Sequence, residues 1–180
     1  MRKRTLIGGV AVLALAVSAL ILRAQEDKSK RPSPPAKAEC KLAGGKHVAV
    51  DYSSPRAKGR KVFGGLVPYG EVWRTGANEA TSFVTDTDIN VGDTAVPAGS
   101  YSLFTIPNEN KWTLIISKKT GEWGTNYPGT ENDLARIDMK SSKTSAPVEN
   151  FTIAFDQSSN GCTMRIDWET TRATVDITKK

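Results

Sequence analysis

The C-terminal half of the chain alternates apolar and polar residues with a period of two, and this pattern limits the folds open to it. The alternation covers residues 135–140, 151–155, 162–168 and 172–177. Successive side chains of a β-strand point to opposite faces, so each of these segments can bury one face and expose the other. We therefore expect four consecutive strands here, each with one face against a core.

The upstream half also has the composition of strands, and no segment shows a sustained helical stripe. Strands are expected at residues 47–52, 81–85, 100–106 and 111–117. The connections at 97–99, 107–110 and 158–161 are short and rich in turn-forming residues. Together these segments predict an all-β domain, either an antiparallel β-sandwich or a jelly-roll-like double sheet.

Residues 54–80 interrupt the strand pattern. This segment holds five glycines, two prolines and four large apolar residues, namely Phe63, Leu66, Tyr69 and Trp73. Long irregular connections in compact domains are uncommon and are usually functional or disordered. The apolar content argues against disorder. We expect one long irregular loop that packs against the domain, and it is the segment in which to look for a functional site.

The N-terminus has the pattern of an export signal. Arg2, Lys3 and Arg4 precede an uncharged stretch from Leu6 to Leu22. Residues 1–24 are expected to be a cleaved signal peptide or, as the alternative, an uncleaved membrane anchor. Residues 25–39 then predict a flexible tether and residues 40–180 a single β domain. The chain is expected to be exported, to the periplasm or the extracellular space, with anchoring to the inner membrane if the signal is retained.

The formal charge of +6 does not belong to the expected domain. Residues 1–24 carry four basic and no acidic residues, whereas the chain from His47 onward carries 15 basic and 16 acidic ones. Nucleic-acid binding needs a basic face on the domain itself, so it is not expected. The two cysteines, Cys40 and Cys162, are expected to form one disulfide in an exported protein; two free buried thiols are the alternative.

Two motifs of the chain are similar to those of a known family. The first consists of Tyr52-Ser53-Ser54-Pro55, then Lys58-Gly59-Arg60-Lys61-Val62-Phe63-Gly64-Gly65-Leu66-Val67-Pro68-Tyr69-Gly70, then Val72-Trp73-Arg74-Thr75-Gly76-Ala77-Asn78-Glu79-Ala80-Thr81. The second is Val96-Pro97-Ala98-Gly99-Ser100-Tyr101-Ser102-Leu103-Phe104. From about Cys40 to its end the sequence resembles an uncharacterised bacterial family catalogued as domain of unknown function 2911. The resemblance implies an exported β domain and brings no activity with it.

The candidate binding residues all lie in the 54–80 loop. They are Arg60, Tyr69, Trp73, Arg74, Asn78 and Glu79. Arginine can hold a carboxylate or phosphate with two parallel hydrogen bonds, amide and carboxylate groups can fix hydroxyls, and aromatic rings can stack on a ligand. The structural alternative is an internal salt bridge between Arg74 and Glu79 that fixes the loop, with Asn78 capping a turn.

Other chemistries have weaker support. Residues 86–93 alternate oxygen-bearing side chains as a calcium loop does, but they lack its glycine and its final glutamate, so a polar hairpin turn is expected. The only histidine, His47, lies on an expected strand outside any catalytic motif, and one histidine with two cysteines does not make a normal zinc site. We expect no metal and no cofactor.

Three functions remain open from the sequence. The first is an exported protein that binds a small molecule, a glycan or an envelope component through the loop. The second is a hydrolase that uses Glu79 with a second carboxylate. The third is a structural or protein-interaction module. Trp112, Trp123 and Trp168 could line a carbohydrate platform, although tryptophans in strands usually belong to the core.

Overall fold

The computed structural model describes residues 27–180, so the expected signal segment lies outside the described residues. The described chain divides into residues 27–31 and a larger unit, Pro32–Lys180. The first part contains the 3-10 turn η1 (Lys28–Lys30), whose start is capped by the carboxylate of Asp27 through the Ser29 N–H at 3.1 Å. Between residues 27 and 180 no helix is long and apolar enough to cross a membrane.

The larger unit is all-β. Its strands all pair in antiparallel fashion, and the described residues contain no α-helix. The short turns η2 (Ala43–Gly45) and η3 (Thr130–Asn132) lie between strands. The strands are β1 (Pro35–Leu42), β2 (Lys46–Ser53), β3 (Thr81–Thr85), β4 (Ile89–Val91), β5 (Thr94–Val96), β6 (Gly99–Ile106), β7 (Lys111–Ser117), β8 (Asp133–Ser158) and β9 (Gly161–Lys179).

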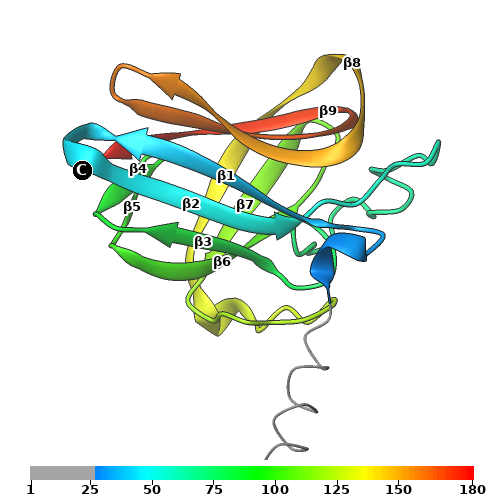
Figure 1. Cartoon of the computed structure of the whole chain (residues 1–180), viewed down its shortest axis with the longest axis horizontal. Helices are drawn as coiled ribbons and strands as arrows, with labels where there is room; N and C mark the ends of the chain where they lie inside the picture. The colour runs from blue at the N-terminus through cyan, green and yellow to red at the C-terminus, as the bar shows by residue number, and fades with distance from the viewer. Residues whose placement is uncertain (1–26) are drawn as a thin grey trace, which may run out of the picture. The chain divides into compact units, whose positions relative to one another are not determined.

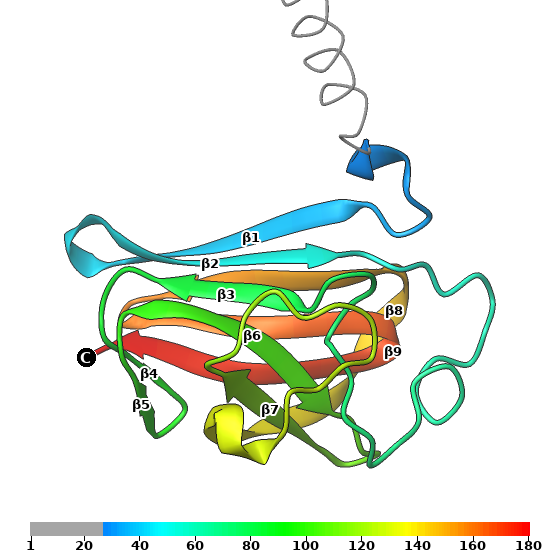
Figure 2. The ribbon, with the colours of Figure 1, turned by 90° about the horizontal axis from the view of Figure 1, so that it is seen from below.

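The strands form one sheet, which differs from the expected sandwich or double sheet. The order is β1-β2-β3-β6-β7-β8-β9-β4-β5, and it is not closed into a barrel (Figure 1). The four strands expected in the C-terminal half are present as two long ones, β8 of 26 residues and β9 of 19. Because these two strands run on without a break, the sheet bends over itself instead of dividing in two. Seen from below, β3 and β6 lie in front of β8 and β9 (Figure 2).

The bend lies where the long strands change register. Shifts occur between Lys143 and Val148 and between Val148 and Thr152, and Glu169 opposite them has a positive φ of 54°. The buried side of β9 changes there from even residues (162–168) to odd residues (173–177). Bulges of this kind sharpen the local twist and let a strand turn a corner. The bend therefore places both halves of β8 and β9 around the same core.

The end of β2 and the start of the long loop are hydrogen-bonded to β8 at Phe151 and Ile153. The Ser54 hydroxyl donates to the Phe151 carbonyl at 2.7 Å, and the Phe151 N–H donates to the Pro55 carbonyl at 2.9 Å. The Tyr52 hydroxyl donates to the Ile153 carbonyl at 3.3 Å and accepts from the Ile153 N–H at 3.1 Å. The two folded halves of the sheet are thus joined along one side without a continuous ladder.

The Cys40–Cys162 disulfide predicted from the sequence is present. It joins β1 to β9 across 122 residues of sequence, with the two Cα atoms 6.1 Å apart. Next to it, the Gln157 side-chain amide donates to the carbonyls of Lys41 and Gly161, each at 2.9 Å. Strand β1 starts at Pro35, so the end of the segment expected to be a tether pairs with β2.

The Tyr52 hydroxyl gives a stability prediction. The residue is 8% exposed, and burial raises its pKa, so the hydroxyl stays protonated and serves both groups of Ile153. Tyr52→Phe leaves a buried N–H and C=O without this partner, and we expect a loss of about 1.5 kcal/mol in the free energy of unfolding. Urea denaturation measures it. Tyr101→Phe is the control: Tyr101 is also 8% exposed, but it makes one bond, to the carbonyl of the exposed Pro97, so its loss should cost less.

Candidate ligand-binding site

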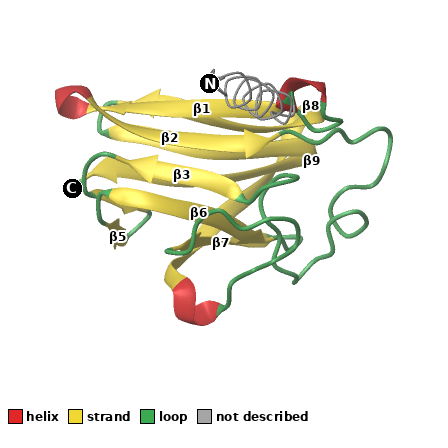
Figure 3. Cartoon of the chain, turned by 60° about the horizontal axis from the view of Figure 1, so that its bottom comes forward, coloured by secondary structure: helices red, strands yellow, loops and turns green. Residues whose placement is uncertain are grey.

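The loop of residues 54–80 contributes to the core as well as to the surface. It contains no strand and forms the long connection between β2 and β3 (Figure 3). Phe63 is 3% exposed and lies edge-on to Trp112, with ring centroids 4.7 Å apart. Trp73 is 9% exposed and stacks on Trp168 with centroids 5.9 Å apart. The loop is therefore held by a cluster of aromatic rings.

Polar contacts fix the loop backbone at both ends of this cluster. Trp73 exchanges two backbone hydrogen bonds with Thr105 of β6, both 2.8 Å long, and its indole N–H donates to the Gly76 carbonyl at 3.0 Å. The Glu169 carboxylate, at the bend of β9, accepts from the Val62 N–H at 2.9 Å. The loop is thus attached to β6 on one side and to the bend on the other.

A pocket of about 360 Å³ lies against this loop, and we call it the Arg74 pocket. Most of its lining comes from residues 55–77, and Ser33, Thr125 and Trp168 complete it. Trp73 and Trp168 give it an aromatic wall, while Arg60, Glu71 and Arg74 are its charged residues. The volume is within the usual range for small-molecule sites.

The guanidinium of Arg74 is unusual because it is partly buried and unpaired. Its Nε is buried and has no hydrogen-bond partner, and no carboxylate in the described chain forms an ion pair with it. The salt bridge to Glu79 considered from the sequence is not formed. Burial lowers the pKa of Arg74 below the ordinary arginine value, but a guanidinium remains charged at neutral pH. The pocket thus contains a desolvated positive charge.

The other two charged residues of the Arg74 pocket differ in how they are held. Arg60 Nε donates to the Ala57 carbonyl at 2.9 Å and Nη2 donates to the Arg56 carbonyl at 2.7 Å, which fixes the side chain without neutralising it. Glu71 is exposed and is the one carboxylate among the residues that line the pocket. Two arginines against one glutamate leave the lining with a net positive charge, which suits an anionic ligand.

The structure separates the remaining candidates from this pocket. Tyr69 is 37% exposed and lines a different pocket on the side of the β6–β7 turn. The Asn78 amide donates to the Ser33 carbonyl at 3.1 Å and to the Ser53 hydroxyl at 3.2 Å, so it ties the loop to the start of the domain. Glu79 is half-buried, pairs with Trp123 through a backbone bridge, and lines neither of these two pockets.

Comparison with protein families gives one match for the sequence. The model of a family described as Protein of unknown function (DUF2911) matches residues 33–177. The chain belongs to this family. The match runs from just before β1 to within β9, so the DUF2911 region includes both the loop and the bend. Searches of curated proteins and of solved structures found no match.

The residues that sequence reasoning considered for other chemistries have ordinary contacts. His47 Nδ1 lies 2.9 Å from the Asp86 carboxylate at the surface. Residues 86–93 lead from β3 into the β4–β5 hairpin, where Asp88 accepts from the Ala98 N–H at 2.9 Å. Over residues 27–180 no group of three or more His, Cys, Asp or Glu side chains could hold a metal ion.

Sequence reasoning did not connect Trp168 and Thr125 with the residues of the loop, although it considered Trp168 for a carbohydrate platform. Both are remote in sequence from the loop. The alternation around Trp168 predicts a core residue of a strand, and Trp168 is indeed 1% exposed. The only available signal was the change in the alternation between Trp168 and Ala173, which marks a bulge. Bulges are frequent next to functional sites, so this change was a weak pointer to the site.

Proposed function

We propose that this DUF2911 chain is an exported binding protein that takes a small anionic molecule into the Arg74 pocket. The observation that carries the proposal is the buried Arg74 Nε without a partner. Leaving a buried charged donor unsatisfied costs free energy, and a ligand carboxylate or phosphate would remove that cost. Trp73 and Trp168 would pack against the apolar or aromatic part of the same ligand.

The disulfide supports the location proposed for this activity. Disulfides persist in oxidising compartments and are rare in the reducing cytosol. A Cys40–Cys162 bond between two strands therefore favours a periplasmic or extracellular protein. The bond is consistent with export by an N-terminal signal.

Matched ligand pairs test the proposal. Benzoate and phenyl phosphate are compared with benzyl alcohol, and hexanoate with hexanol, in a thermal-shift assay on the full-length chain. A ligand that binds only the folded state stabilises it by about 2.7 kcal/mol at a hundred times its Kd. We expect the anions to raise Tm by several degrees and the neutral partners to leave it unchanged. A screen in which alcohols and acids behave alike would overturn the proposal.

Arg74→Met is the decisive variant. It removes the unpaired charge and keeps a long side chain, so we expect loss of anion binding together with a gain in stability of about 1 kcal/mol. Glu71→Gln is the matched control, because it removes a negative charge from the same pocket and should preserve or strengthen anion binding. A loss of stability in Arg74→Met would instead assign Arg74 a structural role.

A further inference from the structure

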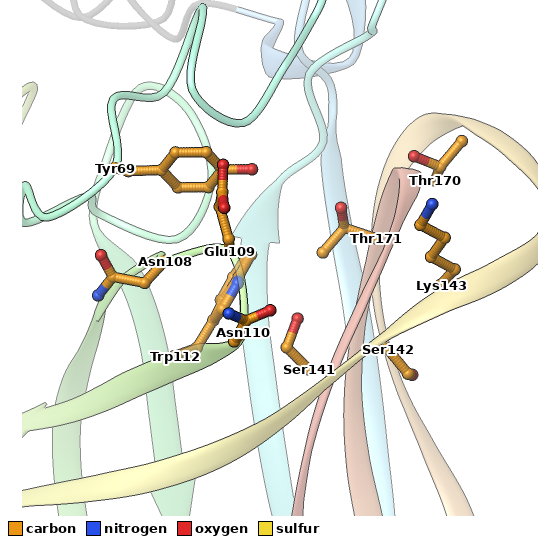
Figure 4. A pocket seen from close by; sticks show the side chains of 10 residues that line it. All are labelled: Tyr69, Asn108, Glu109, Asn110, Trp112, Ser141, Ser142, Lys143, Thr170 and Thr171. Atoms are coloured by element: carbon orange, nitrogen blue, oxygen red, sulfur yellow. The ribbon is translucent and has the colours of Figure 1, made fainter.

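A second pocket includes one residue of the loop, Tyr69, and shares no lining residue with the Arg74 pocket. Its volume is about 540 Å³. Tyr69 of the loop and the β6–β7 turn at residues 108–110 form one side, and residues 141–143 with 170–171, at the bend of β8 and β9, form the other (Figure 4). We call it the Tyr69 pocket.

A buried donor without an acceptor lies at the base of the Tyr69 pocket. Trp112 is 1% exposed, yet its indole Nε1 has no hydrogen-bond partner. The two neighbouring buried tryptophans are satisfied: Trp73 donates to the Gly76 carbonyl at 3.0 Å and Trp168 to the Glu149 carbonyl at 3.2 Å. Buried polar groups are nearly always paired, so an unpaired one is a candidate contact for a ligand. Trp112 and Asn110 both line the pocket, and a ligand oxygen there could accept a hydrogen bond from the indole N–H (Figure 4).

The polar side chains around the pocket are not hydrogen-bonded to the rest of the described chain. Within residues 27–180 none of them makes a side-chain hydrogen bond to another protein group, and the single carboxylate, Glu109, and the single amine, Lys143, form no ion pair. Hydroxyl and amide groups can both donate and accept, and the two opposite charges balance. Such a lining suits a neutral ligand with many hydroxyls. The neutral polar residues are Asn108, Asn110, Ser141, Ser142, Thr170 and Thr171.

The Tyr69 ring lies at the rim of the pocket, against the turn at Gly64. A Cβ at Gly64 would lie 2.7 Å from Tyr69 Cε2, so only glycine allows the ring to lie on this turn, where φ is 76°. The next residue, Gly70, donates its N–H to the Pro107 carbonyl at 2.9 Å, which joins the loop to the β6–β7 turn. Burial, with Glu109 and Glu169 nearby, raises the pKa of Tyr69 and keeps its hydroxyl protonated as a donor. An aromatic face beside hydrogen-bonding groups can stack on the C–H face of a sugar ring.

We infer that the Tyr69 pocket binds a neutral saccharide, with Tyr69 stacking on a sugar ring and the Trp112 Nε1 donating to one of its oxygens. This site is independent of the proposed anion site. The two pockets nevertheless border the same aromatic cluster: Trp73 lines one and Trp112 the other, and their ring centroids lie 6.5 Å apart.

Binding of defined sugars tests the inference. The full-length chain is screened on an array of neutral oligosaccharides and then titrated calorimetrically with cellotriose, maltotriose and tri-N-acetylchitotriose. We expect at least one neutral saccharide to bind. Tyr69→Ala should weaken that binding about tenfold or more, and Trp112→Phe about fivefold through loss of one hydrogen bond. Asn110→Ala, on the exposed turn, tests the site without touching the core.

Two controls show whether the saccharide occupies the Tyr69 pocket. Trp123→Phe changes an exposed tryptophan outside the pocket, and Arg74→Met changes the other pocket; both should retain saccharide affinity. The inference fails if no neutral saccharide binds to the wild-type chain. It also fails if Tyr69→Ala and Asn110→Ala, confirmed as folded by circular dichroism, bind as the wild type does. Loss of saccharide binding in Arg74→Met would assign the sugar to the anion site instead.

Discussion

Replacing Cys40 and Cys162 together by alanine is expected to lower the free energy of unfolding by about 4–5 kcal/mol. The bond spans 122 residues, and a cross-link over so long a loop strongly restricts the unfolded chain. Both cysteines are buried, at 0% and 2% exposure, so the variant also loses packing. For a domain of this size, the loss corresponds to a decrease in Tm of about 10 °C.

Reductant supplies the internal control for this prediction. Dithiothreitol should lower the Tm of the wild type towards that of the double variant and leave the variant unchanged. Guanidinium denaturation with and without reductant gives the free energies. A wild type that is insensitive to reductant after verified reduction would mean that hydrogen bonds such as those of Gln157 hold β1 to the β8–β9 hairpin without the cross-link.

Phe63→Ala is expected to cost about 4 kcal/mol, although Phe63 belongs to an irregular loop. The ring is 3% exposed and contacts three indoles, those of Trp73, Trp112 and Trp168, at centroid distances of 6.0, 4.7 and 6.1 Å. Removing it leaves a cavity that well-packed neighbours cannot fill. Urea denaturation followed by circular dichroism measures the change.

Leu66→Ala is the matched control for this substitution. It removes an apolar side chain from the same loop, but Leu66 is 45% exposed, so the change should stay within about 0.5 kcal/mol. Equal, small effects at both positions would show that the loop only covers the domain. A large effect at Phe63 alone would show that the loop completes the core.

The alternation of the sequence predicted most strands and the faces that they bury. Ile137 and Met139 in β8 and Met164 and Ile166 in β9 are all buried as expected. The arrangement in one sheet was not predictable, because alternation shows which face is buried and not whether neighbouring strands continue into each other. That depends on the bulges near Lys143 and Glu169, where local backbone conformation decides.

Asp167 shows the limit of the same reasoning. Its position in the alternation predicts a face turned to solvent, yet the residue is 2% exposed. Arg172 donates to its carboxylate with bonds of 2.7 and 2.8 Å, and Arg165 donates to it from the other side. Long arginine side chains cover the carboxylate and satisfy it. A strand pattern cannot anticipate which side chains lie over a given position.

The loop was correctly expected to pack, but its polar residues could not be sorted from the sequence. Arg60, Trp73 and Arg74 line one pocket, Tyr69 lines another, and Asn78 ties the backbone. All six candidates lie within twenty residues of one another in sequence. Their separation follows from the turns of the loop, including positive φ values at Gly64, Thr75 and Asn78, which change the direction of neighbouring side chains.

The aromatic cluster also gives the protein an intrinsic optical signal. Trp73, Trp112 and Trp168 are buried together, whereas Trp123 is 55% exposed, so Trp123→Phe would leave only the clustered indoles to emit. Two of them line the Arg74 pocket and the third lines the Tyr69 pocket. Their emission would therefore respond to an occupant of either pocket, and quenching by a dissolved anion such as iodide would report how far each pocket opens to water.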